Sequence, residues 1–355
     1  GVPGPVHVNI PLAEPLYEQL ELDKESFEVM HWDHSLKTLN SSDWKELKSE
    51  WRQYKKKLII IGQMNSNEKL DGILDKMIND HNCVVLCEST SNVKAKKAIR
   101  NIDRLMLYME DDEFMAELFK ADLLISIGGA IVSKKVKSFF RKNKPVSHWY
   151  LGQNNMKPDV FQSLTHCIDV DAYEVFSGLV EDVGLSNKNY LDAWLSLDQR
   201  LANIQLSFEE KLPYCDYTVI KEILYSLPKN TDLHIGNSSP VRYSNLFEID
   251  SSIEVYCNRG TSGIDGMSST AVGSAMLTDR INVLITGDIA FMYDSNAFWS
   301  TELPNQLRVV VINNGGGGIF RIIPGPDQTE ELEAYFETGH QRNMKSLAEA
   351  YGLEY

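Results

Sequence analysis

The residues best suited to chemistry are an acidic and an amide side chain at the ends of two apolar runs. Asp288 follows INVLITG, and after 24 further residues the pair Asn313-Asn314 follows LRVVVI, with glycines continuing from position 315. Carboxylate and amide oxygens are hard donors suited to Mg²⁺ bound together with phosphates, and glycine lets the backbone approach a diphosphate closely. The same residue types also cap helices and make tight turns. Spacing alone leaves both interpretations open.

The elements around these residues predict an α/β fold with two parallel, three-layer sheets. Short apolar runs such as LIIIG, CVVLCE and DLLISIGG alternate with helical stretches over residues 57–172, and a second such series fills residues 213–355. Continuous apolar strands between helices indicate sheets that are covered on both faces. We expect residues 173–212 to be a helical connector, residues 17–56 to be a linker ending in a helix, and residues 1–10 to be a strand without a sheet of its own.

Composition excludes several classes of protein. The chain has 35 basic and 50 acidic side chains, a formal charge of −15, which disfavours nucleic acid or an anionic membrane as the main partner. No apolar run approaches the roughly 20 residues that span a bilayer, and the first residues do not read as a signal peptide. The five cysteines are scattered and mostly in apolar surroundings, which favours reduced thiols and a cytoplasmic setting.

The string GDIAFMYDSNAFW followed by VVVINNGGGGIF resembles the diphosphate and Mg²⁺ motif of thiamine-diphosphate (ThDP) enzymes. The resemblance implies that Asp288, Asn314 and the carbonyl of Gly316 bind Mg²⁺, or Mn²⁺ in its place. Ile264 corresponds to the aliphatic residue that bends the cofactor, and Ile289 departs from the glycine found in many members. The other positions implied to contact the cofactor are Ser262, Gly263, Gly287, Ala290, Gly317 and Ile319.

Four further strings, NRGTSGIDG, GNSSPVR, GGIFRIIP and GPVHVNIPLAEPL, resemble the menaquinone-pathway branch of this family. That branch decarboxylates 2-oxoglutarate and adds the product to isochorismate, so both substrates are dicarboxylates, which arginine binds well. The resemblance implies Ser238, Arg242 and Arg259 as substrate contacts. It also implies that Lys134 and Lys135 reach in from the middle domain, a dinucleotide-like domain of residues 57–172. The implied apolar wall over the cofactor consists of Ile319, Phe320 and Ile323.

The resemblance also has consequences for the whole chain. Residues 1–16 correspond to the last strand of a pyrimidine-binding domain, and residues 213–355 to a diphosphate domain that is cut short. No glutamate here is assigned to the family's catalytic position, so we expect no catalytic residue in this stretch and no activity from it alone. The middle domain lacks G-x-G-x-x-G after its first strand, which predicts no bound nucleotide. Homodimers or larger homo-oligomers are typical of the family.

Two alternatives stay open from the residues. One is another ThDP carboligase or lyase acting on a different 2-oxo acid. The other is a binding module that keeps the fold without catalysis. The arginines also fit ordinary surface ion pairs, and the lysine-rich stretch that begins at Lys134 fits a solvated helix face.

Overall fold

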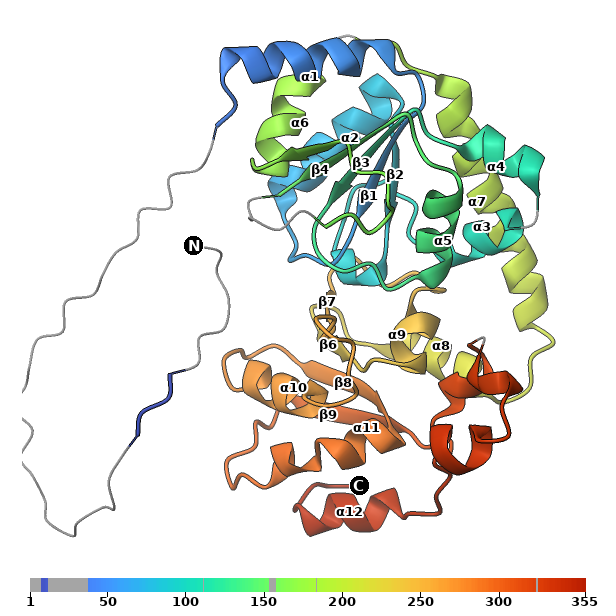
Figure 1. Cartoon of the computed structure of the whole chain (residues 1–355). Helices are drawn as coiled ribbons and strands as arrows, with labels where there is room; N and C mark the ends of the chain where they lie inside the picture. Colours follow the sequence, from blue (N-terminus) through green and yellow to red (C-terminus); the bar gives the residue numbers. More distant parts are fainter. Residues whose placement is uncertain (1–7, 12–37, 111, 153–157, 183, 324) are drawn as a thin grey trace, which may run out of the picture.

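The computed structural model describes residues 8–11, 38–110, 112–152, 158–182, 184–323 and 325–355. Its strands form two sheets in which all neighbours are parallel, in the orders β2-β1-β3-β4-β5 and β7-β6-β8-β9. Figure 1 shows the two sheets in separate halves of the molecule, which we call the first and second units. The predicted α/β class with two parallel sheets is confirmed.

The first unit has strands that are buried on both faces, as their unbroken apolar sequences predict. Helix α2 packs beside α6 and helix α3 beside α5 and α7, so helices cover both sides of the sheet (Figure 1). Its strands are β1 (Lys57–Ile61), β2 (Val84–Cys87), β3 (Leu123–Ile127), β4 (Ser147–Leu151) and β5 (His166–Ile168). Its helices are α1 (Ser41–Gln53), α2 (Glu68–His81), η1 (Ser89–Ser91), α3 (Ile102–Met109), α4 (Glu113–Phe119), α5 (Lys134–Lys142), α6 (Ala172–Val180) and α7 (Lys188–Glu209).

The predicted linker and connector both contribute to the core of the first unit. Trp51 of α1 and Trp194 of α7 are fully buried in the same apolar cluster as Trp149 of β4. Asn40 caps α1 through a capping box, which satisfies backbone N–H groups at the start of that helix. The predicted helix at the end of residues 17–56 is therefore present, whereas the predicted domain boundaries stay predictions.

The second unit carries the strands that end at the candidate site. They are β6 (Asp232–Ile235), β7 (Glu254–Tyr256), β8 (Asn282–Gly287) and β9 (Leu307–Ile312). The helices are α8 (Asp216–Ser226), α9 (Ser239–Ser244), α10 (Met267–Ala275), α11 (Asp288–Tyr293) and α12 (Met344–Ala350). Short turns of helix follow at η2 (Ser295–Phe298), η3 (Gly318–Arg321), η4 (Pro326–Gln328) and η5 (Leu332–Phe336). The register of β8 and β9 pairs Gly287 with Ile312, so both strands end at one edge of the sheet.

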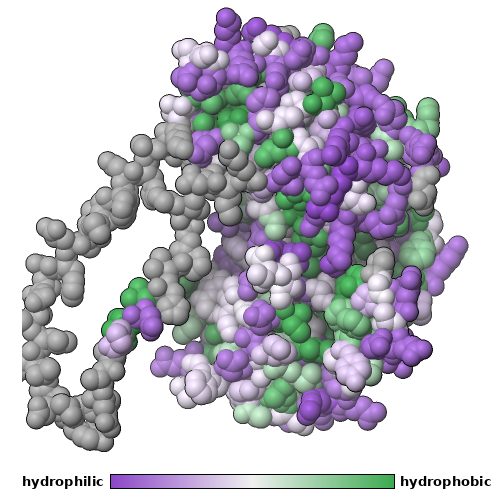
Figure 2. Space-filling model, in the orientation of Figure 1, coloured by the Kyte–Doolittle hydropathy of each residue, from purple (hydrophilic) through white to green (hydrophobic). Residues whose placement is uncertain are grey.

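The N-terminal strand prediction falls mostly outside the described residues. Of residues 1–10, only 8–10 are described, and they form neither helix nor strand. Among the described residues no helix is both long enough and apolar enough to cross a membrane. Figure 2 shows that polar side chains dominate this face of the molecule over the first unit.

Candidate functional site

A cavity of about 390 Å³ lies at the carboxyl edge of the second sheet, and we call it the second-sheet cavity. This is the edge at which open parallel sheets bind ligands. Most of the residues implied by the resemblance line it: Ser238, Ser262, Gly263, Ile264, Gly287, Asp288, Ile289, Ala290, Asn314, Gly316, Gly317, Ile319 and Phe320. The structure therefore brings together side chains and glycines from the ends of β6, β8 and β9 and from the loop after β7.

Asp288 sits at the inner end of this cavity because strand β8 stops at Gly287 and helix α11 begins at the next residue. Its side chain is almost fully buried. One carboxylate oxygen accepts the Ile289 N–H at 2.7 Å, and the other accepts the Gly315 N–H at 2.7 Å. His340 Nε2 lies 3.3 Å from the second oxygen. The carboxylate is therefore oriented by two backbone N–H groups, with the imidazole of His340 close by.

Asn314 is oriented by a residue that sequence reasoning did not assign. Its Nδ2 donates to Asp216 Oδ2 at 2.8 Å, and Asp216 is the first residue of α8. Since the amide nitrogen is used in this bond, the amide oxygen is the atom left to act as a ligand. Asp216 and His340 lie far from the GD and NN strings in sequence, so only the folded structure reveals them.

These residues fit a divalent cation with a diphosphate. The donor set is a carboxylate, an amide oxygen and a backbone carbonyl, all hard oxygen donors. A side chain at Gly316 would place its Cβ 2.8 Å from the Glu337 carbonyl oxygen, and Gly315 has a φ of +83°. Glycine is therefore required in this loop, and no atoms crowd the space beside Gly287 within 4 Å of a Cβ built there. Asp288, Asn314 and Gly316 supply these donor types, and their binding of a metal stays a prediction.

Neither of the two predicted arginines, Arg242 and Arg259, is among the lining residues of this cavity. Burial, followed by the charge of Arg259, lowers the pKa of Arg242, while the carboxylates of Asp103 and Glu88 act in the opposite direction. Arg259 Nη1 donates to Asn237 Oδ1 at 2.5 Å. The Nε atoms of both arginines are buried without a hydrogen-bond partner among the described residues. Guanidinium groups that have no carboxylate partner are suited to an anionic ligand.

The two predicted lysines lie at the exposed start of α5. Lys134 and Lys135 are exposed, neither lines the second-sheet cavity, and Lys135 forms an ion pair with Glu110. Lys137, one turn further along α5, is the lysine whose pKa is lowered by burial and by the nearby charges of Arg259 and Arg242, against the opposing effect of Glu88. Ile323 is also absent from the cavity lining. The roles of Lys134, Lys135 and Ile323 stay predictions.

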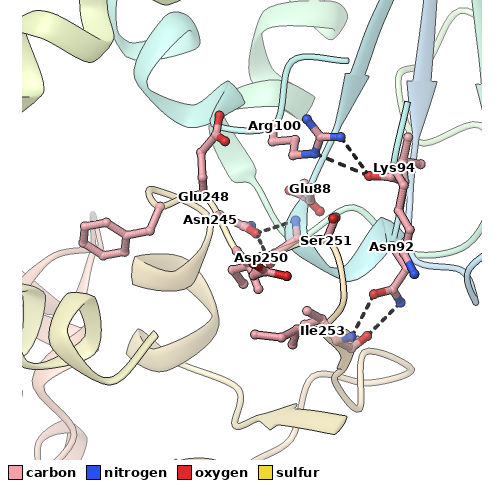
Figure 3. Close-up of a pocket in the computed structure, with 14 residues that line it drawn as sticks. Glu88, Asn92, Lys94, Arg100, Asn245, Glu248, Asp250, Ser251 and Ile253 are labelled. Carbon is pink, nitrogen blue, oxygen red and sulfur yellow. Dashed lines mark hydrogen bonds between the residues drawn. The ribbon is translucent and has the colours of Figure 1, made fainter. Parts of the chain in front are cut away.

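A joint of polar side chains holds the two units together (Figure 3). Asn92 donates to the Val255 carbonyl at 3.0 Å and accepts the Val255 N–H at 2.7 Å. Glu88 is fully buried and accepts the N–H groups of Val132 at 2.6 Å and Ser133 at 2.7 Å. Burial raises the pKa of Glu88 to about 7. Val132 in turn packs in the apolar core of the second unit, so Glu88 anchors a crossing segment.

A cavity of about 320 Å³ lies at this joint (Figure 3), and both cations among its described lining residues already have hydrogen-bond partners. Arg100 donates to the backbone carbonyls of Val93, Ala95 and Ala98, and Lys94 pairs with Glu254 at 2.7 Å. The positive charges beside Glu88 and Asn245 therefore serve the joint itself. The arginine pair remains the better candidate for recognition of an anion.

Comparison with known proteins gives the chain its relatives. A family model described as the middle domain of thiamine pyrophosphate matches residues 23–235. Curated relatives are 2-succinyl-5-enolpyruvyl-6-hydroxy-3-cyclohexene-1-carboxylate synthases. The protein of Flavobacterium psychrophilum is 41% identical over 352 residues, and that of Flavobacterium johnsoniae is 40% identical over 354 residues. The protein of Cytophaga hutchinsonii is 38% identical over 357 residues. These matches cover 99% of this chain but only 62–63% of each relative, so the chain spans less than two thirds of their length.

Proposed function

The chain belongs to the family of thiamine pyrophosphate enzymes that carry this middle domain, and we propose that the second-sheet cavity holds the diphosphate of that cofactor with Mg²⁺. Asp288, Asn314 and the carbonyl of Gly316 are the proposed metal ligands. The glycines at 315–317 leave the backbone of this loop without side chains, which lets a diphosphate approach it closely, and nothing lies within 4 Å of a Cβ built at Gly287. Bound ThDP supplies the electron sink for decarboxylation of a 2-oxo acid.

The residues of this chain then serve to position, shield and bind. Ile264 and Ile319 line the cavity as apolar side chains and limit the access of water to the reacting atoms. Ser238, at the end of β6, lines the same cavity with a hydroxyl group. Arg242 and Arg259 lie beside it, where they can pair with substrate carboxylates. Lys134 and Lys135 are further candidates for carboxylate contacts.

We propose that the reaction is the decarboxylation of 2-oxoglutarate and the addition of its succinyl unit to isochorismate, in menaquinone biosynthesis. The observation that carries this substrate choice is that the charges of Arg242 and Arg259 influence each other while neither arginine has a carboxylate partner among the described residues. A substrate with one carboxylate needs one such group, whereas a dicarboxylate uses a cationic cluster. The names of the relatives support the same reaction. We also propose a homo-oligomer, as in the family, with Mn²⁺ as an alternative metal.

The test uses the full gene product, because a catalytic glutamate is not assigned among these residues. Consumption of 2-oxoglutarate with isochorismate, ThDP and Mg²⁺ is followed by mass spectrometry of the product, beside an Asp288→Ala variant. We expect product from the wild type, and neither product nor Mg²⁺-dependent ThDP binding from the variant. Turnover of pyruvate with no turnover of 2-oxoglutarate would instead favour the alternative of another ThDP carboligase.

A further inference from the structure

Asn237 connects the substrate and cofactor sides of the site through one buried side chain. It lies two residues after the end of β6 and is 2% exposed. Its Nδ2 donates to the carbonyl of Asn258 at 2.6 Å and to that of Gly263 at 2.7 Å. Its Oδ1 accepts Arg259 Nη1 at 2.5 Å and the Cys257 thiol at 3.5 Å. Both amide hydrogens and the amide oxygen are therefore used.

These partners determine which way the amide points. Backbone carbonyls only accept hydrogen bonds and a guanidinium only donates them, so the reverse orientation would oppose like groups at three contacts. The side chain thus ties the loop that contains Ser262, Gly263 and Ile264 to the guanidinium of Arg259. Asn237 lines the second-sheet cavity and also forms a hydrogen bond with Arg259.

We propose that Asn237 is a positioning residue that fixes Arg259 for an anionic substrate while leaving the positive charge of the arginine unneutralised. The proposal rests on the proposed function, in which Arg259 binds a substrate carboxylate. A neutral amide oxygen orients the guanidinium through one N–H. A carboxylate at the same place would form a charge-assisted pair with Arg259 and compete with the substrate for it.

The carboxylates near the two arginines also leave the positive charge of these arginines unneutralised. The two carboxylates that act electrostatically on Arg242, those of Asp103 and Glu88, are bound elsewhere. Asp103 accepts the hydroxyl of Ser133, and Glu88 accepts two backbone N–H groups. Among the described residues, neither arginine of the pair has a carboxylate as a hydrogen-bond partner or in an ion pair. The site therefore keeps its positive charge available.

The backbone beside Asn237 shows why a firm anchor is needed here. Ser238 adopts a φ of +75° and a ψ of −131°, a conformation that is costly for any residue other than glycine. Such a conformation persists where the surrounding contacts determine it. The bonds of Asn237, together with the Val241 N–H donated to the Gly236 carbonyl at 3.2 Å, supply those contacts. Asn237 thus also fixes the position of Ser238 in the cavity.

The experiment replaces Asn237 by Asp, which keeps the size of the side chain, in the full gene product with ThDP and Mg²⁺. We expect the KM for 2-oxoglutarate to rise about 10–100-fold, the range of a lost charge-assisted hydrogen bond. The KM for pyruvate, which lacks the second carboxylate, is expected to change much less. ThDP affinity, measured by calorimetry, is expected to fall because the Asn258 and Gly263 carbonyls lose their donors.

A double-mutant cycle with Arg259→Ala separates positioning from general damage. In the Arg259→Ala background the new carboxylate has no guanidinium to neutralise, so Asn237→Asp is expected to leave the KM for 2-oxoglutarate almost unchanged. Its effect on ThDP affinity is expected to persist. Fully additive KM losses, or equal losses for pyruvate and 2-oxoglutarate, would overturn the proposal. Cys257→Ala, which removes only the thiol contact, is the matched control and should leave both KM values within about twofold, the scale of a weak thiol donor.

Two further outcomes are covered by the same design. If Asn237→Asp does not fold, as judged by thermal unfolding, the neutral variant Asn237→Ser replaces it. That variant must then bind ThDP more weakly and have a higher KM for 2-oxoglutarate. If both the ThDP affinity and this KM stayed unchanged, the proposal would be overturned. A wild type that binds 2-oxoglutarate in calorimetry but does not turn it over would contradict the proposed function alone, because the variants can still be compared by binding. A wild type that neither binds nor turns over 2-oxoglutarate would contradict both the proposed function and the role of Asn237.

Discussion

Replacing Glu88 by Gln should change how the free energy of unfolding depends on pH, as well as the value of that free energy. The folded-state pKa of Glu88 is raised by burial from its ordinary 4.5 to about 7. As the pH rises through this window the unfolded chain releases its proton first, so the free energy of unfolding of the wild type falls. A shift of about 2.5 pKa units corresponds to about 3 kcal/mol over the window.

The glutamine variant lacks this titration but also loses one acceptor. Its single amide oxygen can accept the N–H of Val132 or of Ser133, and the other N–H then faces the NH₂ group. An unsatisfied buried donor costs about 1–3 kcal/mol. We therefore expect Glu88→Gln to be less stable than the wild type near pH 5, and the gap to close or reverse by pH 8.

The assay is urea unfolding between pH 4.5 and 8, followed by tryptophan fluorescence. Trp51, Trp149 and Trp194 are fully buried in the first unit, so their emission reports on the unit that holds Glu88. Glu110→Gln is the control, because its exposed ion pair with Lys135 is worth at most about 1 kcal/mol. If the free energies of unfolding of the wild type and of Glu88→Gln changed in parallel between pH 4.5 and 8, the reasoning would be refuted.

Two further predictions concern the site. Arg242→Ala should raise the KM for 2-oxoglutarate about 10–100-fold in steady-state kinetics, since it removes a charge-assisted contact with a carboxylate. An effect of the same size on pyruvate would argue against dicarboxylate recognition. Asp216→Ala should weaken Mg²⁺ binding about 10–100-fold in calorimetry, because Asp216 orients the amide of Asn314 and outer partners of metal ligands have effects of this size. Unchanged Mg²⁺ affinity would show that Asn314 does not need this bond.

The sequence was informative wherever one short string determined a structure by itself. Continuous apolar runs such as Leu58–Ile61 predicted buried parallel strands, because only a sheet covered on both faces accommodates them. The places where β8 and β9 end followed from those runs and the glycines after them. The positions of Asp288 and Asn314 at these strand ends could therefore be predicted, whereas their role as metal ligands came from the resemblance and stays a prediction.

Contacts between distant segments could not be predicted in this way. Asp216 lies 98 residues from Asn314 and meets it only because α8 begins beside the end of β9. On α5 the sequence drew attention to Lys134 and Lys135, yet helical geometry turns Lys137 toward the arginines and leaves the other two exposed. Asn237 sits inside the GNSSPVR string, but its function depends on four partners that a local pattern does not contain.

The joint between the units explains how the first sheet contributes to a site that it does not line. Strand β7 is at the edge of its sheet, and Asn92 pairs with both backbone groups of Val255 as a neighbouring strand would. Two residues later the Cys257 carbonyl accepts Gln63 Nε2 at 2.6 Å, and Gln63 follows the end of β1. Arg259 comes two residues after that. The first unit therefore both covers an edge that would otherwise be open to pairing and fixes the segment from which Arg259 reaches the site.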